Sequence, residues 1–306
     1  MSVPVRATIQ LCTYNRARLL ERVLDGCFEQ TATADSYEVV LVNDGSSDET
    51  PAVIEAARRR ATCAFTVVEQ ANAGLARGRN AGILRARGER IIFIDDDVLP
   101  TPVFVEEHLR SHARRPEAIV RGAVINAESF ERLPTPTWTL ANYSANYFWT
   151  SNVSLPRATL GRVGNFTESF REYGWEDIEL GMRLRAAGVR AIFNRFALAF
   201  HYKPRPRQSD VDGMLRQARA QARTALQLRE LQPHWRVVLA TGDDPLRREL
   251  HRAARKLGSL RALERGVGAR HEDRALSGRE LAAVRALVRE TYYAELDAAR
   301  AQRDPA

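Results

Sequence analysis

The stretch RIIFIDDDVL, residues 90–99, sets an apolar run directly against three carboxylates. Residues 91–94 show no alternation with polar residues, which is typical of a strand buried on both faces in a parallel sheet covered by helices. Asp95, Asp96 and Asp97 follow at the carboxyl end of that strand, where ligands bind in open α/β sheets. Neighbouring carboxylates stay ionised together only when positive charge lies among them. The stretch therefore predicts a divalent cation, Mg²⁺ or Mn²⁺, that carries a phosphorylated ligand.

A second interpretation of the carboxylates needs no ligand. The residues that follow them, Leu-Pro-Thr-Pro at 99–102, are typical of a turn, and a helix is expected over 102–113. Asp96 and Asp97 would then be turn and capping residues for that helix. The stretch alone leaves both interpretations open.

Short strands and helices alternate along the chain around this stretch. The alternation, with short connections, predicts the α/β class: a Rossmann-like, mostly parallel central sheet flanked by helices. Because each polar turn before residue 95 follows a strand, we expect these turns to gather at one edge of the sheet. The expected strands, besides the opening stretch, are 7–13, 37–42, 64–69, 118–126, 150–154 and 190–201, the last of them as one or two strands.

A second group of acids, GWEDIEL at 174–180, lies at the expected start of a helix that ends at Gly188. Acids are favoured at helix starts because they complement the positive end of the helix dipole, so a structural role for Glu176 and Asp177 is one interpretation. The other is a catalytic carboxylate that takes a proton from a reacting group.

Length and composition limit the class of protein. The 306 residues, 44% of them hydrophobic, predict one large domain or one domain with an appendage. No apolar run reaches signal-peptide length at the N-terminus, and none reaches the roughly 18–20 residues of a membrane helix. Cys12, Cys27 and Cys63 lack metal-site spacing and are expected to be reduced, buried thiols in a cytoplasmic protein.

The excess of positive over negative charge lies entirely in the last third of the chain. Residues 203–306 hold 22 Lys plus Arg against 14 Asp plus Glu, which accounts for the whole net charge of +8. After a Pro/Arg-rich linker at 203–207, helices are expected around 211–231, 245–264 and 278–302. The middle helix combines basic residues with an apolar stripe, and it could lie on an anionic membrane surface, pack on a neighbouring domain or form a homodimer. The stripe comprises Leu250, Ala254, Leu257, Leu260 and Leu263.

Six motifs in order resemble the family 2 inverting glycosyltransferases of the GT-A fold. They are LCTYNR, LVNDGSSDET, NAGLARGRNAGI, FIDDD, SNVSL and GNFTESFREYGWEDIELGMRLRAAGVRAIF followed by AFHY. The Gly-Trp-Glu-Asp form with a downstream His further resembles the subset of galactosyl- and N-acetylgalactosaminyltransferases. The resemblance covers roughly residues 5–204, so we expect a GT-A domain over 1–204 and a basic, mainly helical region over 205–306.

The resemblance implies a role for each matching residue. It places a divalent metal, Mn²⁺ or Mg²⁺, on Asp97 and Asp95, with His201 completing the site. Asn43 departs from the Asp that many members have there to accept from a uracil ring, which makes a uridine donor less secure. The implied nucleotide-sugar site comprises Thr13, Tyr14, Asn15, Arg16, Asn43, Asp44, Arg79, Asn80, Asp95 and Asp96.

The resemblance also implies catalytic and acceptor-binding residues. Asp177 matches the general base that takes the proton of the acceptor hydroxyl. Glu176 would hydrogen-bond the acceptor, and the two roles could be exchanged. Trp175 is expected either to bind the acceptor by stacking on a sugar or to pack in the core.

These features together imply a metal-dependent inverting glycosyltransferase that moves a sugar from a nucleotide-diphosphate sugar, first of all a UDP-sugar, to a hydroxyl of a glycan or lipid-linked acceptor. Cell-surface polysaccharide synthesis in the cytoplasm or at the inner face of the membrane is the expected setting. One alternative is a non-catalytic homologue that binds a nucleotide sugar or a partner. A sugar-1-phosphate nucleotidyltransferase is disfavoured. That class has a glycine-rich phosphate loop just after the first strand, whereas this chain has no glycine before Gly26. Nucleic-acid binding is not expected, since the arginines are dispersed among acids with few aromatics.

Overall fold

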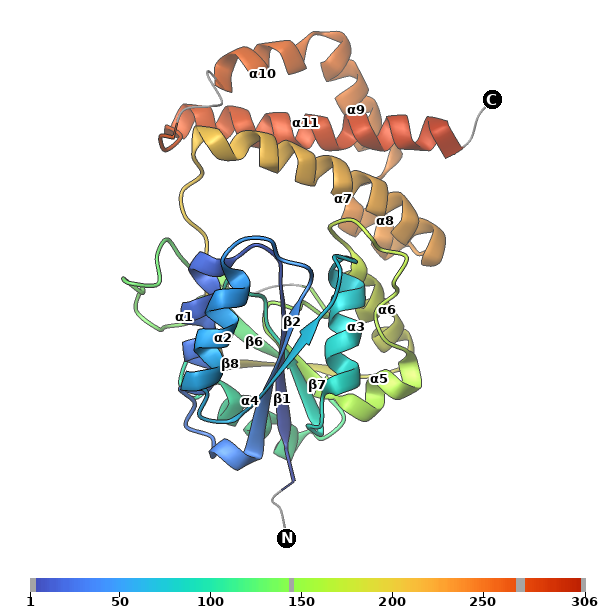
Figure 1. The fold of residues 1–306 in the computed structure, drawn as a ribbon. Helices are drawn as coiled ribbons and strands as arrows, with labels where there is room; N and C mark the ends of the chain where they lie inside the picture. Colours follow the sequence, from blue (N-terminus) through green and yellow to red (C-terminus); the bar gives the residue numbers. More distant parts are fainter. Residues whose placement is uncertain (1–3, 143–145, 268–272, 304–306) are drawn as a thin grey trace. The chain divides into compact units, whose positions relative to one another are not determined.

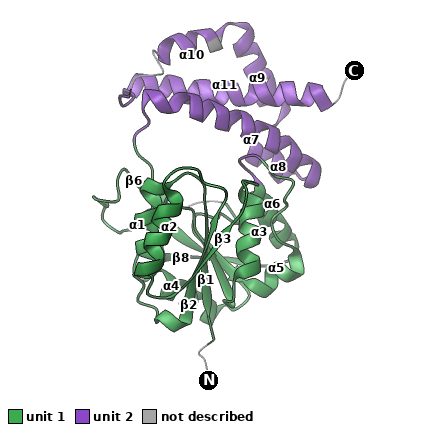
Figure 2. Cartoon of the chain, viewed as in Figure 1, with its two compact units in different colours: residues 1–171, 176–204 green, residues 172–175, 205–306 purple. Residues whose placement is uncertain are grey.

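The computed structural model describes residues 4–142, 146–267 and 273–303. The chain forms two compact units (Figure 2). The first contains the residues up to 171 and residues 176–204, and it is an α/β unit. The second contains residues from 205 onward and also the short segment 172–175.

The α/β unit is built on one sheet of eight strands in the order β3-β2-β1-β4-β7-β6-β8-β5 (Figure 1). The pairs β1–β2, β1–β4, β2–β3 and β6–β8 are parallel, and the others are antiparallel. The mostly parallel sheet expected from the sequence is confirmed. The strands are β1 (Ala7–Thr13), β2 (Tyr37–Asn43), β3 (Ala64–Glu69), β4 (Arg90–Phe93), β5 (Val98–Pro100), β6 (Ile119–Ala127), β7 (Val153–Pro156) and β8 (Ala191–Tyr202).

Helices cover the sheet, with α1 and α2 against one side and α3 and α5 against the other (Figure 1). All residues of β1 and β2 are buried, as is typical of strands between two helical layers. The helices of this unit are α1 (Ala17–Phe28), α2 (Thr50–Arg60), α3 (Leu75–Arg85), α4 (Phe104–Arg114), α5 (Arg157–Val163) and α6 (Glu176–Ala186).

The turn expected at 99–102 is partly wrong. Val98–Pro100 forms β5, which pairs antiparallel with β8 so that Val98 lies opposite His201. Proline is tolerated there because β5 is the edge strand of the sheet. The strand expected at 150–154 is shifted to Val153–Pro156, and residues 150–152 form the turn before it.

In the second unit, two long helices pack along each other, α7 (Val211–Leu231) and α11 (Gly278–Arg303). Their shared core includes Val211, Leu215, Val284 and Leu287. The single helix expected over 245–264 is wrong, because Gly258 takes a φ of +78° and breaks it. The other helices are α8 (Trp235–Thr241), α9 (Pro245–Lys256) and α10 (Ser259–Val267).

Candidate active site

The three carboxylates after β4 have three different environments. Asp95 accepts hydrogen bonds from Ser151 Oγ at 2.5 Å and from Arg79 Nη2 at 3.2 Å. Asp96 accepts from the hydroxyl of Thr13 at 2.8 Å. Burial raises the pKa of Asp96 to about 7; Arg16 opposes this rise and Asp97 adds to it. Asp96 and Asp97 lie in a turn, as the second interpretation expected. Their expected capping role is wrong, because Val103 precedes α4 and no side chain caps the helix.

Asp97 is the carboxylate that meets a histidine. Its Oδ1 lies 3.6 Å from Nε2 of His201, and its Oδ2 lies 3.7 Å from Nη2 of Arg16. The contact follows from the pairing of β5 with β8, in which the amide of Tyr202 also donates to the carbonyl of Asp97 at 2.8 Å. The ring of His201 contacts Asn126 through Nδ1 at 3.3 Å. This pair offers an oxygen and a nitrogen to one cation, a donor set that suits Mn²⁺.

The side chains of the described residues do not form a complete metal site by themselves. Within the described ranges, no group of three or more His, Cys, Asp and Glu side chains is gathered closely enough to hold a metal ion. Mg²⁺ and similar ions usually take one or two carboxylates together with substrate phosphates and water. A two-residue site on Asp97 and His201 therefore fits an ion that arrives with a diphosphate.

Arg79, on α3, joins the two acidic clusters of the sequence. Its Nη1 donates to Glu176 at 2.5 Å, and its Nη2 donates to Thr150 at 2.7 Å as well as to Asp95. Its side chain is almost fully buried, at 5% exposure, and that of Glu176 is 8% exposed. Burial works against the guanidinium charge, but Glu176 and Asp95 outweigh it and hold the pKa of Arg79 above its ordinary value. The arginine thus fixes residues 95 and 176 in one site.

Asp177 follows Glu176 at the start of α6, and its Oδ1 accepts a hydrogen bond from the amide of Ile178 at 2.7 Å. Burial, followed by the charge of Glu176, raises the pKa of Asp177 to about 7, and Arg79 opposes the rise. A carboxyl with this pKa can both accept and release a proton near neutral pH.

Two left-handed residues precede this pair of acids. Gly174 has a φ of +109° and Trp175 a φ of +73°, a rare conformation for an aromatic residue. The indole nitrogen of Trp175 donates to the carbonyl of Gln221 at 2.8 Å, and its side chain packs against a second apolar cluster of α7 and α11 that includes Leu226 and Leu296. The structure thus gives Trp175 a packing environment within the second unit. The predicted stacking on a sugar remains a prediction.

The turn after β2 is built from Asn43 and Asp44. Asn43 donates to Glu69 at 2.7 Å and accepts from the amide of Ser46 at 3.1 Å, so both ends of its side chain are engaged. Asp44 accepts from Gln70 at 2.6 Å and from the amides of residues 73 and 74 at 3.0 Å. Both are buried. These hydrogen bonds hold the turn after β2 in place at the edge of the site.

The turn after β1 contacts the turn after β2. Asn15 takes a φ of +52° and its Oδ1 accepts from the amide of Ser47 at 2.8 Å. The Tyr14 side chain is 48% exposed. Asn80, by contrast, binds the backbone of Phe166 in both directions, at 2.9 and 3.0 Å, and so ties α3 to the segment before α6.

Sequence reasoning missed Thr150 and Ser151 as site residues, although both contact Arg79 or Asp95 directly. The available signal was a pair of small hydroxyl residues at the start of an expected strand. Behind them, the buried His108 and His112 both contact the Ser154 hydroxyl at 2.8 Å, and His108 also contacts Asn152 at 3.0 Å.

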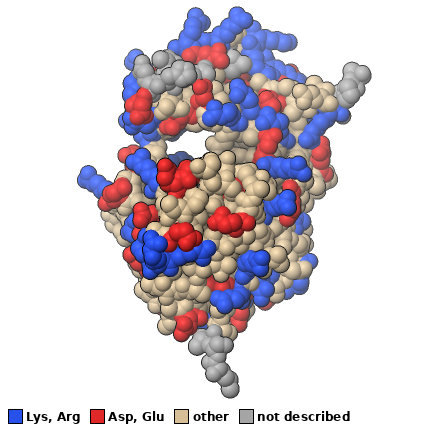
Figure 3. All heavy atoms as spheres, in the orientation of Figure 1, with Lys and Arg blue, Asp and Glu red and all other residues tan. Residues whose placement is uncertain are grey.

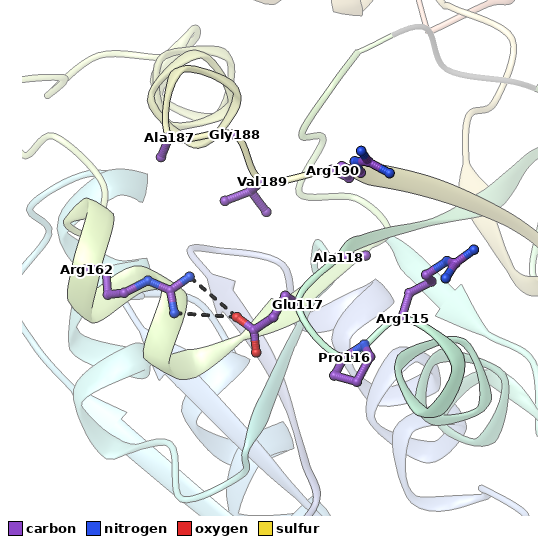
Figure 4. A pocket seen from close by; sticks show the side chains of 9 residues that line it. All are labelled: Arg115, Pro116, Glu117, Ala118, Arg162, Ala187, Gly188, Val189 and Arg190. Carbon is purple, nitrogen blue, oxygen red and sulfur yellow. Dashed lines mark hydrogen bonds and ion pairs between the residues drawn. The ribbon is translucent and has the colours of Figure 1, made fainter.

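A hollow of about 460 Å³ lies elsewhere in the unit (Figure 4). Its lining includes Ala118 and Arg190, which directly precede β6 and β8, whereas His201 lies near the carboxyl end of β8. Arg162 and Glu117 form an ion pair across it at 3.4 Å. This hollow is therefore separate from the acidic site.

Comparisons with known proteins agree with the geometry. The family model described as "Glycosyl transferase family 2" matches residues 8–174. Validoxylamine A glucosyltransferase of Streptomyces hygroscopicus subsp. jinggangensis is 32% identical over 229 residues, which cover 63% of this chain and 54% of that protein. The chain thus spans about half the length of the curated relatives it matches.

Solved structures match nearly the whole chain at low identity. A mannosyltransferase, PcManGT from Pyrobaculum calidifontis in complex with GDP-Man and Mn²⁺, has a TM-score of 0.55 at 18% identity and covers 97% of this chain and 73% of its own. S. aureus TarS 1–349 in complex with UDP has a TM-score of 0.55 at 18% identity, with coverages of 98% and 92%. These neighbours confirm the expected GT-A fold.

Proposed function

Because the chain belongs to glycosyl transferase family 2, we propose that it moves a sugar from a nucleotide-diphosphate sugar to an acceptor hydroxyl with inversion of configuration. The observation that carries the proposal is the contact of Arg79 with both Asp95 and Glu176. This contact brings the acidic cluster at the end of β4 beside Glu176 and its neighbour Asp177, and burial raises the pKa of Asp177 to about 7.

Asp177 is the proposed general base. The acceptor oxygen attacks the anomeric carbon as the bond from that carbon to the diphosphate breaks, and the acceptor proton passes to the Asp177 carboxylate. Of the two neighbouring acids, Glu176 is held by Arg79 at 2.5 Å, whereas Asp177 contacts a backbone amide and has a pKa of about 7. This difference supports Asp177 as base and Glu176 as a positioning or acceptor-binding group.

Asp97 and His201 are the proposed holders of a divalent cation, Mn²⁺ or Mg²⁺, with Asp95 nearby. The relative PcManGT was solved with Mn²⁺, which supports a metal of this kind here. Bound there, the cation would stabilise the negative charge that develops on the leaving diphosphate. Arg16, 3.7 Å from Asp97, would add a fixed positive charge on the same side.

The donor we propose first is a UDP-sugar, because TarS was solved with UDP. The side chain of Asn43 is fully engaged in its turn, so base selection would depend on the backbone of that turn and on groups beside it. A glycan or lipid-linked saccharide is the proposed acceptor, in a cytoplasmic setting.

Ligand-induced thermal shifts test the donor site. UDP, TDP and GDP would be compared with and without Mn²⁺ or Mg²⁺ on the intact chain and on Asp97→Asn. A ligand at about 100 times its dissociation constant stabilises the fold by roughly 2.7 kcal/mol, which raises the Tm by several degrees. We expect a shift that requires both nucleotide and metal and is lost in the variant. No shift with any nucleotide would favour a partner-binding homologue instead.

Product stereochemistry tests the inverting mechanism separately. With the nucleotide identified, NMR of the new glycosidic bond would show the anomeric configuration opposite to that of the donor. Retention of configuration would contradict the role of Asp177 as a base that activates the acceptor directly.

A further inference from the structure

Helix α9 presents its apolar face to solvent. Leu246 is 70% exposed, Leu250 is 60% exposed and Leu257, just past the helix end, is 89% exposed. With spacings of four and seven residues, the three leucines lie on one face of the helix. All twelve residues of α9 are described, and none of them is buried. A helix of a globular unit normally buries such a stripe, whereas α9 exposes it.

The polar face of α9 is the one that contacts the rest of the unit. Arg252 and Arg255 both pair with Asp297 on α11, the former at 3.1 Å. His251 contacts Glu290 at 2.5 Å and stacks on the ring of Tyr293 with the centroids 3.9 Å apart.

These contacts fix the rotation of α9 about its axis. Asp243, whose side chain is 2% exposed, anchors the start of the helix through Arg248 at 3.5 Å and also pairs with Arg300 of α11 at 2.6 Å. Rolling α9 to bury its leucines would break these ion pairs. The leucine face is therefore held outward.

The charge around the leucines selects the partner. Of the five basic residues of helix α9, Arg248, Arg252 and Arg255 pair with acids on the inward side. Arg247 and Lys256 flank the leucines, and the helix has one acid, Glu249. On α10, Arg261 and Arg265 are also exposed, and Figure 3 shows Lys and Arg gathered over the part of the surface where α9 and α10 lie. The preceding helix α8 exposes Trp235 at 60% and Leu239 at 58%. Apolar side chains rimmed by guanidinium groups, with a tryptophan close in sequence, match the surface of an anionic membrane.

A second copy of the chain fits this face less well. In an antiparallel pair of α9 helices, Arg247 near one end would meet Lys256 near the other end of the partner helix, and in a parallel pair each would meet its own equivalent. Both arrangements set like charges together at the rim of the contact.

We infer that the face formed by Leu246, Leu250 and Leu257 inserts into the headgroup region of a membrane containing anionic lipids, with Arg247 and Lys256 near the phosphates. The helix lies in the plane of the surface. Among the described residues, no helix is long and apolar enough to cross a bilayer. The inference goes beyond the proposed transferase activity and does not depend on it.

Vesicle sedimentation of the full chain tests the inference, without nucleotide or acceptor. Vesicles of phosphatidylcholine alone would be compared with an equal mixture of phosphatidylcholine and phosphatidylglycerol. We expect binding to the mixed vesicles that weakens with added salt, and a loss of about tenfold or more in Leu250→Gln/Leu257→Gln. The matched control is Leu84→Gln/Leu140→Gln, whose leucines are 82% and 83% exposed in the other unit; it should bind like the wild type.

Three results would overturn the inference. The first is the absence of wild-type binding to the mixed vesicles, or equal binding to both compositions. The second is an equal loss of binding in the control variant. The third is a wild-type dimer in light scattering that the α9 variant abolishes while vesicle binding is unchanged, since that result would assign the face to a second copy. Circular dichroism and Tm of both variants, which alter only exposed side chains, check that the fold is retained.

Discussion

Substituting Asp177 by Asn should abolish catalysis and stabilise the protein at the same time. The variant removes the proposed base, and loss of general-base catalysis typically lowers the rate by about 10²- to 10⁴-fold. It also removes a carboxylate that is costly to ionise in the folded chain, because burial and the charge of Glu176 raise its pKa to about 7.

The stability effect has a definite sign. A folded-state pKa above the unfolded value of 3.8 means that the folded chain binds the proton more tightly. Stability therefore falls as pH rises from about 4 to 7, and the full penalty remains above pH 7. A pKa of about 7 in place of 3.8 corresponds to an upper bound of about 4 kcal/mol. Since the Asp177 side chain is partly exposed, we expect Asp177→Asn to gain about 1–2 kcal/mol at pH 8, or about 2–8 °C in Tm.

Thermal unfolding in EDTA at pH 8 and pH 5 measures this gain, and release of nucleoside diphosphate measures the activity. At pH 5 the gain should fall by more than half, because the folded wild-type carboxyl is then mostly protonated. The matched control is Glu176→Gln, which weakens the buried contact with Arg79 and should lose roughly 1–3 kcal/mol. A destabilised Asp177→Asn, or a gain independent of pH, would refute the reasoning.

Three further predictions concern other parts of the site. His201→Ala should raise the Mn²⁺ concentration needed for half-maximal nucleotide binding, measured by titration calorimetry, and unchanged metal dependence would remove His201 from the metal site. Arg79→Lys keeps the charge but loses the fork that reaches three partners, so both Tm and activity should fall; a variant that matches the wild type would contradict the joining role of Arg79. Burial lowers the pKa of His108 to about 3 and that of His112 to about 4, so stability that is complete above pH 6.5 should be lost as pH falls toward 4; a flat Tm between pH 7 and pH 5 would show that these histidines do not contribute.

Local patterns were enough to predict most of the fold. The strand at 7–13 and the first three residues of the apolar run at 91–94 are confirmed in neighbouring parallel strands. A continuous apolar run such as 91–94 has few other stable placements. The gathering of the strand-end turns at one edge is also confirmed, since Thr13 contacts Asp96 and Arg16 lies near Asp97.

The features that the sequence did not reveal depend on pairing between distant segments. Val98–Pro100 contains a proline and is only three residues long, and nothing local indicates that it pairs with β8 to bring Asp97 to His201. The partners of Arg79 are similarly distant in sequence. In α9, the expected stripe included Ala254, but ion pairs to α11 decide which face turns inward, and the exposed face is that of Leu246, Leu250 and Leu257.

Residues 172–175 belong to the helical unit although the residues on either side of them in the sequence belong to the α/β unit. This placement limits where the gene can be cut to separate the two units. Arg223 of α7 pairs with Glu172 at 2.6 Å, Thr224 donates to the carbonyl of Tyr173 at 3.1 Å, and Trp175 donates to Gln221. A gene cut after codon 204 would remove every one of these anchors while leaving Asp177 two residues from the segment they hold. The helical region is thus not a detachable module, and exchanging it between homologues requires that segment 172–175 be exchanged with it.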